Sequence, residues 1–369
     1  MESKQVIAQG GIEKIGMKGS FLKLTLPDGQ KAMLEGEILE HRAGIEYILG
    51  VLLSEKYGCI KSLSEIDAVG HRVVHGGEKF NSSVLITDEV IAMVNETIAL
   101  APLHNPPNLK GIYAIQELMP ETPQVAVFDT AFHQTMPDYA YMYGIPYSLY
   151  EKYGIRRYGF HGTSHRYVSK RACEFLGLPY EKQRIITAHI GNGGDTSMGM
   201  TPVEGLIMGT RSGDIDPGVI SYIMEKEHMG TKGISTLLNK FSGVLGISGI
   251  SSDMREIDAA IKADNKRAIL AMDAYNYRIK KYVGSYVAVL GGVDILVFTG
   301  GVGENQAVTR SYVCKNMEFM GIELDEELND KVRAQEVLIS KPSSKVKVVI
   351  IPTDEELTIA RDTVEILKK

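Results

Sequence analysis

Two arginines stand in glycine-rich polar clusters of the sequence and could together hold an anion. Arg72 lies in the string HRVVHGG, and Arg211 lies in MGTRSGDIDP. The planar guanidinium group offers paired N–H donors that match the oxygens of a carboxylate or a phosphoryl group. A lone arginine is more often part of an ordinary surface ion pair, so that alternative stays open for each of them.

Two carboxylates, Asp129 and Glu355, occupy positions where acidic side chains commonly serve a reaction. Asp129 follows the apolar run QVAVF, and a carboxylate at the end of a strand can orient a metal ion or a nucleophile. It could equally cap the next helix, since Asp is a good N-cap residue. The string PTDEEL predicts a capping box, with Thr353 as N-cap and Glu356 at the third helical position. Glu355 is then the residue left to serve a magnesium ion.

The string HGTSH places His161 and His165 four residues apart. Two imidazoles at that spacing on a helix can bind one metal ion. No glutamate separates them as in the HExxH pattern of metalloproteases, so we favour two other roles. One is donation of a hydrogen bond to developing charge, and the other is that of a buried structural imidazole.

Two glycine-rich strings, GNGG at 191–194 and TGGVGEN at 299–305, each follow an apolar run. A strand that ends in a glycine turn exposes backbone N–H groups to an anion, because glycine lets the main chain approach closely. Neither string has the spacing GxGxxG or GxxxxGK[ST], so a tight turn without a ligand is the alternative at each. Their recurrence at two strand ends favours phosphate contacts.

These polar clusters follow β-rich apolar runs that alternate with helix-like segments. The strand-like runs are QVAVF, RIITAH, DILVF and VKVVII, and residues 256–289 have apolar positions at helical spacing. Strands that alternate with helices predict an α/β protein, in which ligands bind beyond the carboxyl ends of the strands. We therefore expect the four polar clusters to meet in one cleft.

The composition argues against several classes of protein. The 369 residues include 40 Lys and Arg against 46 Asp and Glu without a long like-charge run, which gives no support to binding of nucleic acid or acidic membranes. No apolar run approaches the roughly 18 residues of a membrane span, and the first residues lack the apolar core of a signal peptide. Cys59, Cys173 and Cys314 lie far apart and form no CxxC pair, which favours a reducing, cytoplasmic location. The length predicts about two domains.

Long strings of the sequence resemble acetate kinases, in order and across almost the whole chain. They are HRVVHGGEKF, LAPLHNPPN, FDTAFHQTMP, YGFHGTSH, DTSMGMTPVEGLIMGTRSGDIDP, SGVLGISGISSDMRE, FTGGVGEN and IPTDEELTIARDT. The resemblance implies the superfamily of actin, sugar kinases and heat-shock ATPases, and hence an α/β fold of two similar actin-like (ribonuclease H-like) domains around a nucleotide cleft. We expect residues 1–131 plus 357–369 to form the first domain and residues 132–356 the second, which carries the nucleotide and dimer side.

The resemblance implies reversible phosphoryl transfer between ATP and acetate, giving acetyl phosphate and ADP, with Mg²⁺ or Mn²⁺ and in a cytoplasmic homodimer. Such transfer depends mainly on positioning and charge neutralisation. Acetate is already a carboxylate at neutral pH, so it needs no general base. The alternatives are a propionate or butyrate kinase, whose acid is longer by a methylene or two, and a shortened, catalytically impaired nucleotide-binding homologue.

The same motifs imply a role for individual residues. Those implied to be catalytic or to stabilise the transition state are Arg72, Asp129, His161 and Arg211, with His104 as a further histidine of the cleft. The implied pocket for the acetate methyl group consists of Val74, Leu103, Phe160 and Pro202, beside Arg72, and the implied metal ligand is Glu355. The implied nucleotide contacts are His189, Ile190, Gly191, Asn192, Gly193, Asp253, Met254, Arg255, Gly300, Gly301, Val302, Gly303, Glu304 and Asn305.

The chain departs from the family pattern at several points. Met254 and Asp354 stand where the family usually has Phe and Asn. The family's first strand, with its N-x-G-S-S-S-x-K turn, has no counterpart. About a dozen residues, roughly one strand and its turn, are also missing after Gly194. Two alternatives stay open: the protein lacks these segments, or only the sequence as written lacks them.

Overall fold

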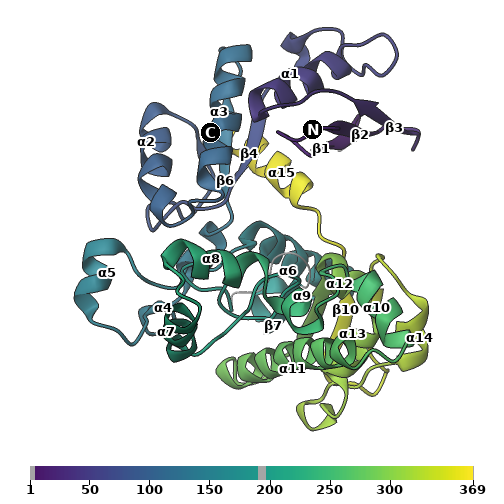
Figure 1. The fold of residues 1–369 in the computed structure, drawn as a ribbon. Helices are drawn as coiled ribbons and strands as arrows, with labels where there is room; N and C mark the ends of the chain where they lie inside the picture. The colour runs from purple at the N-terminus through teal and green to yellow at the C-terminus, as the bar shows by residue number, and fades with distance from the viewer. Residues whose placement is uncertain (1–4, 190–196, 369) are drawn as a thin grey trace. The chain divides into compact units, whose positions relative to one another are not determined.

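The chain divides into two compact units, each with its own sheet and core. The structure, a computed structural model, describes residues 5–189 and 197–368. Unit 1 is formed by Met1–Ala131 with Glu356–Lys369, and unit 2 is formed by Phe132–Glu355. Figure 1 shows the elements of each unit along the chain, from purple at the N-terminus to yellow at the C-terminus.

Unit 1 contains a three-stranded sheet in the order β4-β6-β5. β4 (Val69–Val73) runs parallel to β6 (Gln124–Phe128), and β5 (Val84–Leu85) is antiparallel to β6. The central strand β6 is buried at every position, which explains its continuous apolar sequence. α2 (Asp88–Glu96) and α3 (Asn105–Leu118) pack on this sheet through Val94, Leu109 and Ile112. α15 (Glu355–Leu367) approaches β4 so closely that a Cβ on Gly70 would lie 2.5 Å from Thr363 Oγ1.

The rest of unit 1 is a small antiparallel sheet and one helix. The sheet has the order β1-β2-β3, formed by β1 (Gln9–Glu13), β2 (Phe21–Thr25) and β3 (Lys31–Glu35). α1 (His41–Leu52) packs on α3 through Leu49, Ile115 and Met119. Short 3₁₀ turns lie at Leu63–Glu65 and Thr97–Ala99, and a third, Ala131–Thr135, spans the boundary between the units.

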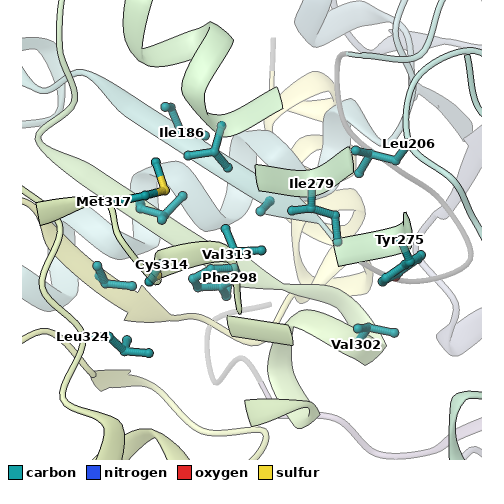
Figure 2. Close-up of a cluster of buried hydrophobic side chains, with 14 of the residues drawn as sticks. Ile186, Leu206, Tyr275, Ile279, Phe298, Val302, Val313, Cys314, Met317 and Leu324 are labelled. Atoms are coloured by element: carbon teal, nitrogen blue, oxygen red, sulfur yellow. The ribbon is translucent and has the colours of Figure 1, made fainter. Parts of the chain in front are cut away.

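Unit 2 contains a four-stranded sheet in the order β7-β8-β10-β9. β7 (Ile185–His189), β8 (Ile295–Thr299) and β10 (Lys347–Ile350) are parallel, and β9 (Val337–Leu338) is antiparallel to β10. Alternate residues of β8 face opposite sides of the sheet. Ile295 and Val297 pack with α6 (Gly162–Leu176), whereas Leu296 and Phe298 join a larger core with α11 (Lys266–Val289). Figure 2 shows this larger core, with Phe298 among its labelled side chains. The sheet is therefore covered by helices on both faces.

The remaining helices of unit 2 are mostly short. They are α4 (Asp138–Tyr141), α5 (Tyr147–Tyr153), α7 (Pro217–Lys226), α8 (Thr231–Lys240), α9 (Gly243–Ser248), α10 (Met254–Lys262), α12 (Gly300–Asn305), α13 (Ala307–Cys314) and α14 (Glu326–Lys331), with 3₁₀ turns at Tyr180–Lys182 and Glu318–Met320. Within residues 5–189 and 197–368, no helix combines the length and the apolar composition that crossing a membrane requires.

The strand predictions are confirmed, and the extent of one helix-like segment needs correction. The four apolar runs form β6, β7, β8 and β10. Only β7, β8 and β10 share a sheet, so their polar ends meet at one edge, while Asp129 follows a strand of the other unit. The segment 256–289 is two helices rather than one. Asp264 has a φ of 58°, in the left-handed region, and Asn265 caps the second helix by accepting from the N–H groups of Arg267 and Ala268.

Candidate active site

Arg72 and Asp129 form a bidentate ion pair in unit 1. The parallel register of β4 and β6 pairs Arg72 with Val127, so the residue that follows β6 comes close to the guanidinium group. Arg72 Nε donates to Asp129 Oδ1 at 3.1 Å, and Nη2 donates to Oδ2 at 2.5 Å. The Asp129 side chain is 1% exposed, whereas that of Arg72 is 41% exposed. The buried carboxylate therefore fixes the plane of a guanidinium group that still reaches the surface.

Three more predicted residues, Val74, Leu103 and His104, belong to unit 1. Val74 follows β4 and is buried, and its backbone N–H donates to Asn108 Oδ1 at 3.1 Å. Because Asn108 lies on α3, this helix positions Val74. His104 directly precedes α3, and Leu103 before it is 59% exposed. The structure thus holds Val74 in the core of unit 1 and leaves Leu103 at the surface.

His161, His189 and Glu355 form one cluster in unit 2. The rings of His161 and His189 stack with their centroids 4.9 Å apart and an angle of 16° between their planes. One nitrogen or oxygen from each of the three residues lies within 4.8 Å of the other two. The three come from different segments: His161 precedes α6, His189 ends β7, and Glu355 begins α15. Such a group can bind a cation through Glu355 or contact an anion through the imidazoles.

His161 has a strained backbone, with φ 56° and ψ 26° in the left-handed region. For a residue other than glycine this costs on the order of 1–3 kcal/mol, and such strain is common where a side chain must be held for function. His165, four residues later, instead lies buried inside α6, with Nδ1 2.7 Å from Thr187 Oγ1. His165 is therefore the buried imidazole of the two, with its ring 5.9 Å from that of His189, while His161 stacks on His189.

A chain of hydrogen bonds that the sequence did not reveal supports this cluster. Ser164 Oγ lies 2.6 Å from His189 Nδ1 and 2.7 Å from Thr353 Oγ1. The backbone N–H of Thr353 donates to Glu304 Oε1 at 3.2 Å, and the N–H of Gly300 donates to the same oxygen at 2.9 Å. The expected capping box at PTDEEL is thus wrong for Thr353, because its hydroxyl contacts Ser164, and α15 begins only at Glu355.

The glycine-rich segment after β8 forms a short helix, α12, and a buried arginine secures it. Gly300 has a φ of 73°, which suits glycine and turns the chain from the strand into the helix. Arg310 is fully buried and donates from Nη1 to Gly303 O at 2.9 Å and from Nε to Asn329 Oδ1 at 2.7 Å. Burial lowers the pKa of Arg310 to about 10, so it stays charged at neutral pH. The backbone of α12 is therefore fixed from inside unit 2.

A cavity of about 390 Å³ lies next to this helix. Its lining consists of Gly209, Ser252, Asp253, Met254, Tyr275, Gly301 and Val302. Four of the predicted nucleotide contacts, Asp253, Met254, Gly301 and Val302, thus share one cavity. Val302 and Tyr275, which also lines it, belong to the apolar core drawn in Figure 2. Asp253 caps α10 and pairs with Arg255, whose hydrogen bonds lower the pKa of that carboxyl to about 2. Asn305 lines a second cavity, of about 340 Å³.

Arg211 differs from Arg72 and Arg255, because no acceptor accompanies its side chain among the residues that the structure describes. It is partly buried, and burial lowers the pKa of its guanidinium group. Among the residues that the structure describes, none forms an ion pair or a side-chain hydrogen bond with it. Its carbonyl oxygen accepts from the N–H of Met208 at 3.1 Å, and Met208 is itself held by α9, since Val244 N donates to Met208 O at 2.9 Å. A cation without a counter-charge among the described residues can pair with an anion from solution.

The segment that carries Pro202 is anchored by a polar group of three side chains. Arg157 and Tyr143 both donate to the Glu204 carboxylate. The Tyr143 hydroxyl accepts from the N–H of Met200 at 2.9 Å, and Arg157 also donates to the Ser197 carbonyl at 2.7 Å. Desolvation and the Glu204 carboxylate raise the pKa of Tyr143, so its hydroxyl stays protonated. Phe160, the other predicted pocket residue of unit 2, is fully buried.

The predicted residues therefore fall into groups, each within a single unit. Val74 and Leu103 belong to unit 1, and Phe160 and Pro202 belong to unit 2. Four predicted nucleotide contacts, Ile190, Gly191, Asn192 and Gly193, lie outside the described residues, as does the start of the connection after Gly194.

Comparison with known proteins decides the family. The sequence model of the acetokinase family matches residues 1–361. An acetate kinase of Azobacteroides pseudotrichonymphae is 70% identical over 378 aligned positions, which cover 100% of this chain and 95% of the relative. The chain belongs to the acetokinase family. The family predicted from the sequence is thereby confirmed.

Solved structures of acetokinases share the fold. The crystal structure of Porphyromonas gingivalis acetate kinase has a TM-score of 0.93 at 63% identity, and covers 98% of this chain and 94% of that one. A propionate kinase from Francisella tularensis has a TM-score of 0.91 at 40% identity, with 99% and 94% covered. The predicted α/β fold with two actin-like domains is confirmed.

The length of the alignment bears on the shortened connection. The alignment with the Azobacteroides acetate kinase runs over 378 positions against the 369 residues of this chain, so at least nine positions of that relative have no counterpart here. An internal difference of this size is close to the strand and turn that the family pattern has after Gly194.

Proposed function

We propose that the protein is an acetate kinase, which transfers a phosphoryl group reversibly between ATP and acetate and forms ADP and acetyl phosphate. Relatives of 70% and 66% identity carry the name acetate kinase. Arg211 is the observation that carries the proposal from family to chemistry. Its partly buried guanidinium group has no acceptor among the described residues, as expected of a group that waits for an anionic substrate.

The chemistry proposed for this chain is electrostatic. The carboxylate of acetate attacks phosphorus without a general base, because it is ionised at neutral pH. Arg211 and Arg72 neutralise the charge that spreads over the transferred phosphoryl oxygens, and His161 donates a hydrogen bond to it. Asp129 holds the Arg72 guanidinium in one plane through two hydrogen bonds. Val74, Leu103, Phe160 and Pro202 are the residues proposed to contact the methyl group of the acid, and His104 is proposed as a further histidine of the site.

Glu355 is the proposed ligand for Mg²⁺ or Mn²⁺. Its carboxylate supplies the oxygen that these hard cations prefer, and it lies with His161 and His189 in one cluster. When bound, such a cation neutralises phosphate oxygens. For ATP and ADP we propose the cavity beside α12, with His189, Arg255, Gly300, Gly303, Glu304, Asn305 and residues 190–193 as further contacts.

An acyl phosphate assay tests the proposed function. Purified protein with Mg²⁺ and ATP should form acyl phosphate from acetate, trapped as the hydroxamate, faster than from propionate or butyrate. No acyl phosphate from any of the three acids would contradict the proposal. Faster turnover with propionate or butyrate would favour the second candidate, a kinase for a longer acid, which the similarity to a propionate kinase supports.

Three further expectations complete the proposal. We propose a cytoplasmic homodimer without nucleic-acid or membrane partners, and light scattering should give twice the 40.6 kDa mass of the chain. We propose residues 1–131 plus 357–369 and residues 132–356 as the two domains. A shortened, impaired homologue is the remaining alternative. It would require a purified protein with the mass of 369 residues that binds nucleotide without turnover.

A further inference from the structure

Two hydroxyl groups connect His189 to the turn before Glu355. Ser164 lies in the first turn of α6 and is fully buried, and its Oγ is 2.6 Å from His189 Nδ1. On its other side the same oxygen is 2.7 Å from Thr353 Oγ1. Thr353 is itself fixed, because its N–H donates to Glu304 Oε1. Hydrogen bonds through Thr353 and Ser164 therefore link the backbone turn before Glu355 to the imidazole ring of His189.

One arrangement of the two hydroxyl hydrogens, those of Thr353 and Ser164, gives each of them an acceptor. Each hydroxyl has a single hydrogen, and among the described residues the only acceptor near the Thr353 hydroxyl is Ser164 Oγ. If Ser164 donated to Thr353, the Thr353 hydroxyl hydrogen would have no acceptor among the described residues. If Thr353 donates to Ser164, then Ser164 donates to His189 Nδ1, and both hydrogens are bonded.

We propose that Ser164 and Thr353 are positioning residues that keep the hydrogen of neutral His189 on Nε2. The ring then donates from Nε2 to an anionic oxygen and offers no lone pair there to a metal ion. Within the cluster of His161, His189 and Glu355, this leaves the carboxylate as the site for a hard cation. The identity of the anion, a phosphoryl group, rests on the proposed function, but the position of the hydrogen does not.

Nitrogen NMR tests the hydrogen position without substrate or turnover. The protein is labelled with ¹⁵N-histidine and measured at about pH 8, above the ordinary histidine pKa of about 6.5. The His189 resonances are those lost in His189→Asn. We expect Nε2 to carry the hydrogen and Nδ1 to be an acceptor. A hydrogen on Nδ1 would overturn the proposal, because Nε2 of His189 would then offer a lone pair instead of a hydrogen.

Kinetics tests the consequence for the reaction. Thr353→Val and Ser164→Ala should each lower kcat by about tenfold or more, with KM for ATP within about twofold, which is the size of effect seen when a supporting hydrogen bond is lost. Thr353→Ser keeps the hydroxyl and should restore most of kcat. The control is Ser169→Ala, because this buried hydroxyl on the same helix bonds Arg166 O and not His189.

The variants also separate this proposal from the proposed function. If Thr353→Val, folded by circular dichroism, turns over like the Ser169→Ala control, Thr353 does not position His189 and the proposal fails. If wild-type protein makes no acyl phosphate while NMR finds the hydrogen on Nε2, the proposed function fails and the hydrogen-bond chain stands.

Discussion

The two arginines predicted to hold the transferred group have opposite surroundings. Arg72 in unit 1 donates twice to a buried carboxylate, Asp129, at 3.1 and 2.5 Å. Arg211 in unit 2 has no acceptor among the described residues, and burial lowers the pKa of its guanidinium group. Arg72 thus has a carboxylate partner in place, and Arg211 has none among the residues that the structure describes.

Because of this difference, Arg72 and Arg211 should contribute differently to folding and to substrate binding. A buried carboxylate needs its cation, so Arg72 should stabilise the folded unit as well as serve the reaction. An unpaired, partly desolvated cation costs stability and regains it only when an anion binds. A cost of this kind is common where activity needs a destabilising group.

The largest expected effect is on turnover in Arg211→Ala. We expect kcat to fall by a factor on the order of a hundred or more, the usual consequence of losing one preorganised charge donor. Arg211→Lys should restore activity only in part, since an ammonium group replaces a two-pronged donor. Urea denaturation should find Arg211→Ala at least as stable as wild type. Normal turnover in the folded alanine variant would remove Arg211 from the site.

The next largest effect is on the free energy of unfolding, which should fall in Arg72→Ala but not in Arg211→Ala. Arg72→Ala leaves the Asp129 carboxylate without its bidentate donor, so the free energy of unfolding should fall by about 1–3 kcal/mol. We expect turnover to fall as well. Arg72→Ala and Arg211→Ala should therefore resemble each other in kcat and differ in urea midpoint. Equal urea midpoints for the two variants would contradict the expected difference in their stability.

In a third measurement the two units should behave alike. Burial lowers the pKa of His75 in unit 1 to about 3 and that of His133 in unit 2 to about 4. Both imidazoles stay neutral in the folded protein, whereas in the unfolded chain they take up protons below a pKa of about 6.5. Stability should therefore fall as the pH falls from 7 towards 4, by about 2 kcal/mol per histidine at pH 5.

Urea midpoints at pH 7 and pH 5 measure this loss. His133→Asn should lose less stability between the two pH values than wild type does, because one of the two titrating groups is gone. If the variant and wild type lose the same stability, His133 does not stay neutral in the folded state.

The smallest effect is expected from a second bidentate pair, Arg171 with Glu336. Its N–O distances of 2.6 and 2.7 Å resemble those of Arg72 with Asp129, but its side chains are 35% and 31% exposed. Arg171→Ala should change the free energy of unfolding by less than about 1 kcal/mol and leave kcat unchanged. A loss as large as that of Arg72→Ala would mean that burial of the carboxylate is not what matters.

The local features of this fold were predictable from sequence, and those that depend on distant partners were not. The runs that form β6, β7, β8 and β10 are apolar and β-branched, so short-range pattern identifies them. Residues 256–289 carry one helical periodicity, and the break at Asp264 depends on a single left-handed residue. Hydrophobic periodicity predicts which face of a helix a residue occupies more reliably than it predicts where the helix ends.

In the candidate site, too, the contacts between residues distant in sequence could not be predicted. Thr353 fits a local capping rule, yet its hydroxyl bonds Ser164, which lies 189 residues earlier. The motif HGTSH contains Ser164, but nothing in its spacing indicates a bond to His189. That Arg72 has a carboxylate partner and Arg211 has none among the described residues is likewise a property of the folded chain, since both stand in similar glycine-rich strings.

Calorimetric titration of acetyl phosphate into wild-type, Arg211→Ala and Arg171→Ala proteins tests most directly whether Arg211 is held for the transferred phosphoryl group. A charge-assisted contact to a phosphoryl oxygen is worth about 1.5–3 kcal/mol, so Kd should rise about tenfold or more in Arg211→Ala and stay unchanged in Arg171→Ala. An unchanged Kd in Arg211→Ala would contradict the account.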